Sequence, residues 1–484
     1  MAPEQKSEAM NEQPGRAEVN TAIPRWRELL FGRRARIVWT ISLGVAIHAF
    51  GWFLVSTIMP SVVLDLGSPH LLSWGTTAFL ALSIPGSACA GYLKGRHGTR
   101  RVLITASSIV IAANLLGFAA ANMEIFLAAR ALQGLGEGMV LALCYILVSD
   151  SLDPVEVSPA FGILAVVWAL ATLVGPWLAG LLTDIASWRF AFLPMLAMST
   201  SFLWLVARHP TPPPAAQSTR KPGLPLGRVA IIGLAITAVS IAGISRDPAE
   251  AGALIAATLL LIASCLHIDR RSAARLFPAD LLSLSRAAPL GIWILGLMFG
   301  SEACAPLYIA YFVQIGHGTS VFFAGQYAAI TAFSWSAAAI FIGRVGRQTS
   351  RTMLLLGPAL LSLGLVMLVF WHELPLAVSA LALVSLGTGF GVSYGYFTEH
   401  VIGLAAASER DVTAGAIPTF ESICGALGAA ISGLLGNAAG FGAEGAADIP
   451  PAVPVTVYGT SAAVSLLVLG AAFRFRRMVI AAGR

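Results

Sequence analysis

Long apolar runs separated by short polar stretches make up the chain from residue 37 onwards. Each run is continuous and about 20 residues long, the length of a helix that crosses a hydrocarbon core about 30 Å thick. A membrane-spanning β-barrel would need alternating apolar and polar positions instead. We therefore predict an all-α polytopic membrane protein with 14 transmembrane helices, spans 1 to 14, at residues 37–59, 73–93, 102–121, 124–148, 159–182, 188–207, 229–245, 251–267, 289–312, 321–343, 352–371, 376–397, 413–436 and 455–473.

Composition supports the membrane class. The chain is 57% hydrophobic and only 11% charged, with a mean hydropathy of +0.79, whereas soluble domains are about 25% charged. The first 24 residues are polar and lack the apolar segment of a signal peptide, so we expect a cytoplasmic tail. The five cysteines lie within apolar runs and lack metal-ligand spacing, so we expect no disulfide, no metal site and no cofactor.

Basic residues occupy alternate loops. With a cytoplasmic N-terminus, the 30 lysines and arginines all fall on the cytoplasmic side except Arg189 and Arg246, which fall outside, and Arg130, which lies within span 4. Because this asymmetry follows the positive-inside rule, the net charge of +6 indicates membrane topology and not nucleic-acid binding. Both termini are then cytoplasmic. Few lysines with much alanine, glycine and arginine suggest a bacterial inner membrane.

Loop charge also repeats along the chain. The loop between spans 2 and 3 is basic and the loop between spans 4 and 5 is acidic, and the same pair recurs eight spans later. This offset predicts two pseudo-symmetric six-helix bundles with an inserted helix pair, an architecture of rocking transporters. The alternative is that the acidic loops are merely solvated. The predicted domains are a disordered cytoplasmic tail at 1–35, an N-terminal bundle at 36–207, a proline-rich cytoplasmic linker at 208–228, the inserted pair at 229–267, a cytoplasmic or interfacial linker at 268–288, a C-terminal bundle at 289–473 and a basic cytoplasmic tail at 474–484.

Four stretches resemble motifs of the major facilitator superfamily, in particular its fourteen-span drug:proton antiporter branch. The first is GYLKGRHGTRR, Gly91–Arg101, between spans 2 and 3. The second is RALQGLGEG, Arg130–Gly138, in span 4, and the third is ATLVGPWLAG, Ala171–Gly180, in span 5. The fourth is APLYIAYFVQIGHGTSVFFAG, Ala305–Gly325, which leads into the second bundle. Together they cover nearly the whole chain after residue 36.

The resemblance implies two bundles around a central cavity that opens alternately to each side, and proton-driven export of amphiphilic small molecules. It assigns conformational roles to two sets of residues. In the loop between spans 2 and 3 these are Gly91, Arg96, Gly98, Arg100 and Arg101, with the acids of the next cytoplasmic loop, Asp150, Asp153 and Glu156, as expected partners. In the antiporter motif they are Ala171, Gly175, Pro176 and Gly180, which we expect to bend span 5 and bring the bundles close.

Two positions depart from the family pattern. The motif between spans 2 and 3 usually contains an aspartate that latches the two bundles, and here Gly95 stands in its place. We expect the acids of the next loop to rebuild that latch. The branch often carries a second aspartate in span 1, and its position is Gly51 here. A proton site must therefore use other residues.

Polar residues at membrane depth are costly, by about 2.5–3.5 kcal/mol for a charge at the helix centre, and are functional candidates. Arg130, Gln133 and Glu137 are spaced to share one stripe of span 4. The stripe predicts a proton or substrate relay facing the cavity, and a buried structural pair is the alternative. No membrane-embedded metal site is expected.

Three further residues are candidates for proton coupling or substrate binding. Glu302 lies near the middle of span 9, where burial would favour the protonated form of a carboxyl and so suit proton uptake and release. Glu421 lies in span 13, and His48 lies in the middle of span 1. For each of them a hydrogen-bonded structural role is the alternative.

The leading functional prediction is a secondary active transporter that exports cationic or neutral amphiphiles by proton antiport. Its partners are a small-molecule substrate, protons and the bilayer, and we expect a monomer that binds no nucleic acid. A proton symporter or facilitator for a nutrient or metabolite is the main alternative. A non-transporting receptor or a membrane enzyme is more distant, because no nucleotide-binding or hydrolase motif is present in the sequence.

Overall fold

The computed structural model describes residues 26–32, 34–208, 226–245, 247–272, 275–342, 350–442 and 449–482. Every regular element in these ranges is a helix. The predicted N-terminal tail up to residue 25, most of the proline-rich linker and the last two residues lie outside the described residues.

The helices follow the apolar runs and extend several residues beyond many of them. They are α1 Trp26–Phe31, α2 Ala35–Asp65, α3 Trp74–His97, α4 Thr99–Phe118, α5 Met123–Ser151, α6 Pro154–Ile185, α7 Phe192–Arg208, α8 Leu226–Ala242, α9 Pro248–Arg271, α10 Ala287–Glu302, α11 Cys304–Tyr311, α12 Val321–Ile342, α13 Ser350–Val369, α14 Leu376–Leu404, α15 Arg410–Ala438 and α16 Ala452–Ala482. Short 3₁₀ segments lie at Pro69–Leu71 (η1) and Trp188–Ala191 (η2).

Within the described residues, 12 helical segments are long and apolar enough to cross a membrane. Helix α8, with 17 residues, and helix α12, with 22, fall outside that set. The count of fourteen therefore stays a prediction. Large apolar side chains on the outer surface, such as Leu260 at 69% and Leu467 at 73% exposure, are explained by contact with lipid.

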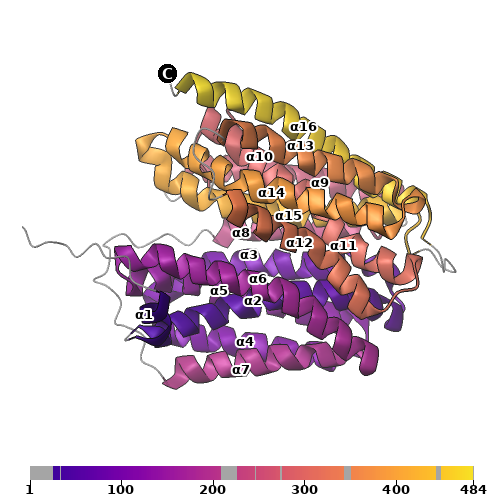
Figure 1. Cartoon of the computed structure of the whole chain (residues 1–484), viewed down its shortest axis with the longest axis horizontal. Coiled ribbons are helices and arrows are strands. Elements are labelled where there is room, and N and C mark those ends of the chain that lie inside the picture. Colours follow the sequence, from indigo (N-terminus) through magenta and orange to yellow (C-terminus); the bar gives the residue numbers. More distant parts are fainter. Residues whose placement is uncertain are drawn as a thin grey trace, which may run out of the picture.

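Two bundles of helices lie one above the other in Figure 1. The N bundle, α2 to α7, is held by the packing of α2 on α5, α6 and α7, of α3 on α5, and of α4 on α5 and α7. The C bundle, α10 to α16, repeats these contacts. Each helix of the N bundle corresponds to the helix that lies eight spans later in the predicted order, so that α2 corresponds to α10 and α5 to α14. The C bundle is accordingly held by the packing of α10 on α14, α15 and α16, of α12 on α14, and of α13 on α14 and α16. The packing thus has the same offset as the loop charges.

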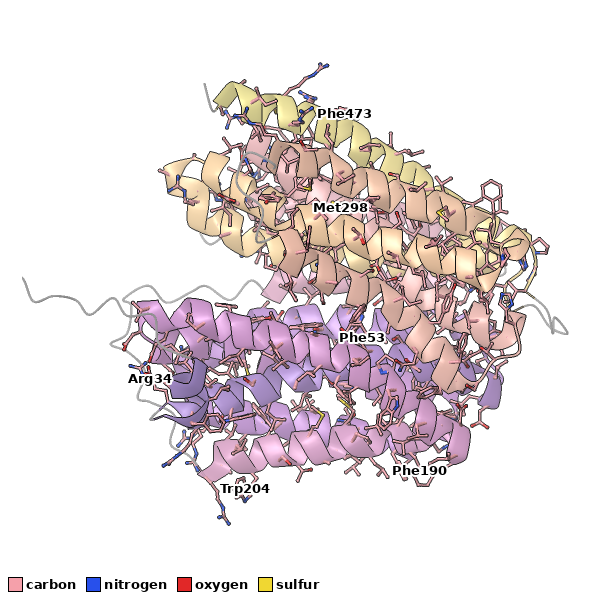
Figure 2. The ribbon with its side chains drawn as sticks, in the orientation of Figure 1. Arg34, Phe53, Phe190, Trp204, Met298 and Phe473 are labelled. Atoms are coloured by element: carbon pink, nitrogen blue, oxygen red, sulfur yellow. The ribbon has the colours of Figure 1, made fainter. Side chains whose placement is uncertain are left out.

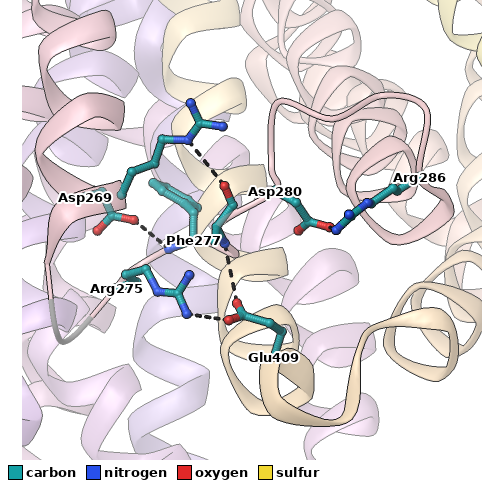
Figure 3. Close-up of polar contacts among 8 residues, drawn as sticks. Asp269, Arg275, Phe277, Asp280, Arg286 and Glu409 are labelled. Carbon is teal, nitrogen blue, oxygen red and sulfur yellow. Dashed lines mark hydrogen bonds and ion pairs between the residues drawn. The ribbon is translucent and has the colours of Figure 1, made fainter.

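The inserted pair, α8 and α9, packs mainly as a hairpin of its own. Helix α8 also packs on α3 of the N bundle and α15 of the C bundle. A buried ion pair between Arg228 in α8 and Asp269 in α9 joins the two helices of the pair. The segment after α9 is then tied to the turn before α15, because Arg275 forms an ion pair with Glu409 (Figure 3).

The ends of the molecule differ in their charge. The basic end carries α1, the α3–α4 turn and the C-terminal end of α16, and the opposite end carries η1, η2 and the start of α12. Figure 1 shows α1 and the C-terminus at the same end of the molecule. Figure 2 shows Arg34 and Trp204 at the basic end and Phe190 at the opposite end, with Phe53 and Met298 in between.

The structure adds three details to the sequence prediction. Span 9 is not one continuous helix, because α10 ends at Glu302, α11 begins at Cys304, and a π-helical turn follows at Phe312–Gly316. The start of the predicted C-terminal tail is not separate from the last span, because α16 continues to Ala482. The predicted loop between spans 2 and 3 is almost entirely helical, with a single break at Gly98.

Candidate functional site

A buried polar network runs along α5 inside the N bundle. The Arg130 guanidinium donates to the Gln133 carboxamide oxygen, and Gln133 Nε2 donates to Glu137 Oε1 over 2.9 Å. Asn114 Oδ1 of α4 lies 3.4 Å from the same Gln133 nitrogen. Exposure of Arg130, Gln133 and Glu137 is at most 2%. The predicted stripe therefore exists, with Gln133 as the link between the two charges.

His48 of α2 brings a fourth member to this network. Its Nδ1 lies 3.5 Å from Glu137 Oε2. Neither of these two buried atoms has a hydrogen-bond partner among the described residues. A single N–H donated by His48 to Glu137 Oε2 would satisfy both atoms.

Gly51 explains how the Glu137 carboxylate fits beside α2. A Cβ at Gly51 would lie 3.1 Å from Glu137 Oε1 and 2.9 Å from the Met195 Cε of α7. The Glu137 carboxylate therefore lies against the position at which the branch that the sequence resembles often carries an aspartate in its first span. The acidic group stands on α5 instead of α2, but it occupies neighbouring space.

Aromatic rings surround the network. The Arg130 guanidinium lies over the Phe79 ring at 4.5 Å from its centroid, and Arg130 Nε donates to the Gly75 carbonyl over 3.1 Å. The His48 ring contacts Phe79 and the edge of Trp168, at centroid distances of 5.7 and 6.1 Å. Arg130 thus has its charge directed at groups of its own bundle.

The C bundle presents an aromatic cluster with two acids. Phe299 of α10 packs on Trp335 of α12 and on Phe390 and Tyr394 of α14, at centroid distances of 5.9, 5.1 and 6.1 Å. Glu302 comes three residues after Phe299, so it shares that helix face. It is partly buried at the break between α10 and α11. The described residues offer it no hydrogen bond or ion pair.

Glu421 of α15 joins the same cluster. Its Oε2 accepts a hydrogen bond from the Tyr394 hydroxyl over 3.3 Å, and its buried Oε1 has no partner among the described residues. Tyr394 lies within electrostatic range of Tyr145 of α5, whose hydroxyl in turn interacts with Trp168. The aromatic clusters of the two bundles therefore meet at Tyr145.

The motif between α3 and α4 is organised differently from its expectation. Gly91 and Gly95 lie inside α3, and the turn rests on Gly98 alone, whose φ of +80° is a conformation that favours glycine. Of the bases in this motif, Lys94 forms an ion pair with Asp150, near the C-terminal end of α5. Arg96 is exposed, and no partner for it is found in the described part of the chain.

The other two acids, Asp153 and Glu156, do not contact the α3–α4 motif, so the expectation that all three acids would pair with this motif was wrong. Asp153 and Glu156 bind Arg34 at the start of α2, at 2.7 and 2.9 Å. Arg100 donates to backbone carbonyls at the end of α7, and Arg101 is exposed. Each of these contacts joins two elements of the N bundle, and none of them involves a described residue of the C bundle.

At the opposite end, the antiporter motif of α6 lies against α12 of the C bundle. Gly180 packs on the backbone of Phe322, where an added Cβ would lie 2.7 Å from the Phe322 nitrogen. Pro176 lies beside Gly325, and Ala171 is buried. Gly175 faces α2 of its own bundle, where an added Cβ would lie 3.2 Å from Phe53 Cβ. The close approach that the motif predicts is thus present.

Hydrogen bonds to backbone groups complete this seam between the bundles. Asp184 of α6 accepts from the N–H groups of Val321 and Phe322, at 3.1 and 3.0 Å, and so caps the N-terminus of α12. Gln314 Nε2 donates to the Thr57 carbonyl over 3.1 Å, and Asn437 Nδ2 donates to the His70 carbonyl over 2.9 Å. The described contacts between bundles are therefore concentrated at the opposite end.

The structure brings His48, Arg130, Gln133 and Glu137 into one network and joins Glu421 to the aromatic cluster of the C bundle, whereas Glu302 follows Phe299 of that cluster by three residues along α10. Sequence reasoning missed Asn114, Asp184 and Tyr394. Asn114 had a usable signal, a lone amide within an apolar run, whereas the roles of the other two depend on which helices pack together. No group of three or more histidine, cysteine, aspartate or glutamate side chains suited to a metal occurs within the described ranges.

Known proteins share both the sequence pattern and the fold. A probable multidrug-efflux transporter of Mycobacterium tuberculosis strain H37Rv is 28% identical over 444 residues, which cover 87% of this chain and 92% of the relative. The multidrug transporter MdtP of Bacillus subtilis is 28% identical over 176 residues, 36% of this chain and 32% of its own length.

Solved structures share the arrangement of helices. The peptide transporter POT in complex with sulfate superposes with a TM-score of 0.66 at 14% identity, over 92% of this chain and 95% of that one. The D-xylose–proton symporter superposes with a TM-score of 0.64 at 14% identity, over 91% of this chain and 97% of that one. The sequence profile of the Major Facilitator Superfamily matches residues 41–429. The chain belongs to the Major Facilitator Superfamily and is a multi-pass membrane transporter of small molecules.

Proposed function

We propose that this transporter exports amphiphilic, cationic or neutral small molecules in exchange for protons. It would act as a monomer in a bacterial inner membrane with both termini in the cytoplasm. The multidrug-efflux relative that spans most of the chain supports the substrate class. The concentration of basic residues at one end of the molecule supports the orientation.

The observation that carries the proposal is the pair formed by Glu137 Oε2 and His48 Nδ1, which lie 3.5 Å apart. Both atoms are buried and lack hydrogen-bond partners among the described residues. A buried carboxylate without compensation costs several kcal/mol, so the charge of Glu137 has to be balanced. Binding or loss of one proton at this pair changes that balance, which is the property a coupling site needs.

The position of this pair fits the departure from the family pattern in span 1. Glu137 Oε1 lies 3.1 Å from where a Gly51 side chain would begin. We propose that the carboxyl on α5 takes over the role that the aspartate of span 1 has in related antiporters. Glycine at position 51 is then required, because any larger side chain would displace the Glu137 carboxylate or Met195.

The aromatic cluster of the C bundle suits the substrate. Phe299, Trp335, Phe390 and Tyr394 offer stacking and cation–π surface, and Glu302 adds a carboxyl on the same face. An amphiphile with a cationic group and an apolar body matches such a surface. A neutral amphiphile would use the rings alone, with Glu302 protonated.

The seam at the opposite end defines a step of the transport cycle. With the bundles joined through α6, the π-helical turn at Phe312–Gly316 and α12, this is the state that would load substrate from the basic end. Rocking would break the seam and form new contacts at the basic end. Lys94 and Asp150, which now pair within the N bundle, are available for that exchange.

Arg130 bears on the main alternative, uptake of an anionic metabolite by symport. Its guanidinium is already bound by the Gln133 oxygen, the Gly75 carbonyl and the Phe79 ring. A substrate anion would have to displace these contacts. This arrangement favours a structural role for Arg130 as the fixed cation beside Glu137.

The test is transport of a cationic dye into or out of proteoliposomes under an imposed pH gradient. We expect the Glu137→Gln, His48→Asn and Glu302→Gln variants to lose gradient-driven transport. Glu124→Gln is the matched control, because Glu124 is an exposed acid at the start of the same helix α5. If Glu137→Gln and Glu302→Gln transport the dye like the wild type, proton coupling at these residues is wrong.

A relocation experiment sharpens the assignment. In Glu137→Ala combined with Gly51→Asp, the carboxyl moves from α5 to the adjoining position on α2. We expect partial recovery of gradient-driven transport over Glu137→Ala alone, whereas a merely structural glutamate would show none. Co-directional movement of dye and protons would favour the symport alternative, and movement without a gradient effect would favour a facilitator.

A further inference from the structure

A cavity of about 320 Å³ lies between the inserted pair and the C bundle. It is lined by side chains from five helices, including Ile236 of α8, Cys265 of α9, Trp293 of α10, Leu427 of α15 and Val464 of α16. It is roughly twice the size of the engineered 150 Å³ cavity that stays dry and takes up benzene. The space is therefore large enough for a sizeable apolar group.

The cavity arises from the way the inserted pair packs. Within the described residues, α9 packs extensively only on α8, although it faces α10, α15 and α16 across the cavity. The lining is mostly apolar, and two of its hydroxyl groups are bound within their own helices. Thr460 donates to the Thr456 carbonyl over 2.7 Å, and Ser301 donates to the Met298 carbonyl over 3.0 Å.

The opposite face of α9 points away from the protein, with Leu259 at 65% and Leu260 at 69% exposure. In a bilayer this face contacts lipid, so the cavity is separated from the acyl chains by the thickness of one helix. The source of an apolar occupant is therefore the bilayer itself.

Positive charge lies at the basic end of the cavity. Arg270 and Arg271 end α9, about 8 Å further along the helix axis than Cys265. Arg271 follows Leu260 by eleven residues and so shares its lipid face, whereas Arg270 reaches the Ala279 carbonyl, two residues after the cavity-lining Phe277. The neighbouring bases are already paired, Arg228 with Asp269 and Arg275 with Glu409.

Arg270 and Arg271 carry positive charge that no acidic side chain among the described residues balances. Arg270 is exposed, and among the described residues its hydrogen bond runs from Nε to the Ala279 carbonyl, over 3.3 Å. Arg271 is exposed, and the described residues provide no hydrogen bond or ion pair for it. The Arg270 guanidinium beside an apolar cavity at the basic end matches the headgroup and chain of an anionic lipid.

We propose that this cavity is a binding site for an anionic phospholipid of the leaflet at the basic end. One acyl chain fills the space between α9, α10, α15 and α16, and the phosphate lies against Arg270. The lipid would take the place of the protein packing that α9 lacks and so hold the inserted pair against the C bundle. The site is separate from the polar network of α5 and does not depend on the proposed transport cycle.

The experiment is native mass spectrometry of the full chain, delipidated and then incubated with phosphatidylglycerol or phosphatidylcholine of the same acyl chains. We expect the wild type to retain phosphatidylglycerol in preference to phosphatidylcholine. Neutralisation of the cavity arginine, Arg270→Gln, should weaken phosphatidylglycerol retention by about fivefold, whereas Arg271→Gln, on the lipid face of the same helix, should change it little. Arg36→Gln, an exposed base at the same end of α2, should leave it unchanged.

Filling the cavity tests the acyl chain. Ile262→Trp on the cavity face of α9 and Val464→Trp on α16 should each abolish retention, while Leu259→Trp, with the same added ring on the lipid face of α9, should not. Elution as a monodisperse species checks that each variant folds.

Three results would overturn the proposal. Retention by Ile262→Trp and Val464→Trp equal to that by Leu259→Trp would exclude the cavity. Equal retention of both lipids would exclude anionic recognition. Binding of inorganic phosphate or glycerol 3-phosphate as tight as that of the whole lipid would show a phosphate site without a chain site.

Discussion

Removing the Asp184 carboxylate should weaken the seam between the bundles. Asp184 stands on α6 of the N bundle and accepts two backbone hydrogen bonds from the first residues of α12, in the C bundle. Replacing an N-cap aspartate by alanine costs about 0.5–2 kcal/mol. Since Asp184 is exposed, we take about 1 kcal/mol, which changes a two-state equilibrium by about fivefold.

The lost hydrogen-bond energy destabilises only the state in which the opposite end is sealed, because the contact joins the two bundles there. Asp184→Ala should therefore raise the ratio of the state open at that end to the sealed state by about fivefold, and Asp184→Asn, which can still accept a hydrogen bond, should raise it less. The matched control is Asp247→Ala. Asp247 is likewise exposed and caps α9 through the N–H of Ala249 over 2.9 Å, but it joins no two bundles.

The assay is a distance distribution between spin labels at Ala121 and His372, which lie at the opposite end on the N and C bundles, in a background with the five cysteines replaced. We expect a second, longer distance to gain population in Asp184→Ala and not in Asp247→Ala. Identical distributions for Asp184→Ala and the wild type would refute the reasoning, since the carboxylate would then contribute nothing to the seam.

Three further predictions concern packing, the basic end and orientation. Gly134→Ala should cost about 1–3 kcal/mol of stability, because its Cβ would fall on the backbone of α3; Gly91→Ala, where a Cβ meets open space, should be neutral in the same thermal-unfolding assay. Lys94→Gln should slow dye transport while changing stability by less than about 1 kcal/mol, because its ion pair is partly exposed. A cysteine replacing His372 should react with an impermeant maleimide in intact cells, and one replacing Arg477 only after permeabilisation; the reverse pattern would contradict the proposed orientation.

Hydrophobic pattern and loop charge were enough to predict much of the fold. Helix positions follow from runs long enough to cross a bilayer, and the eight-span offset of the loop charges recurs in the packing of α10 to α16. The break after Glu302 could not be predicted in the same way. Residues 301–306 contain a proline and small residues, but the sequence alone does not say which turn of an apolar helix its neighbours will distort.

The candidate site was predictable only along single helices. The spacing of Arg130, Gln133 and Glu137 determines that they share one face of α5, whatever packs on it. That His48 meets Glu137, that Lys94 and not Arg96 meets Asp150, and that Tyr394 meets Glu421 depends on the rotation of one helix against another. Those rotations are determined by how many apolar side chains fit together. A single sequence does not show which of these side chains contact one another.

The seam at the opposite end recognises main-chain atoms of its partner. Asp184 binds N–H groups, Gln314 and Asn437 bind carbonyls, and Gly180 rests on the backbone of Phe322. Every residue type except proline presents the same N–H and C=O, so substitutions on the partner side leave these contacts possible. Closure of the opposite end and substrate choice can therefore evolve separately. Mutations can change the chemistry of the aromatic cluster while the backbone contacts of the seam are kept.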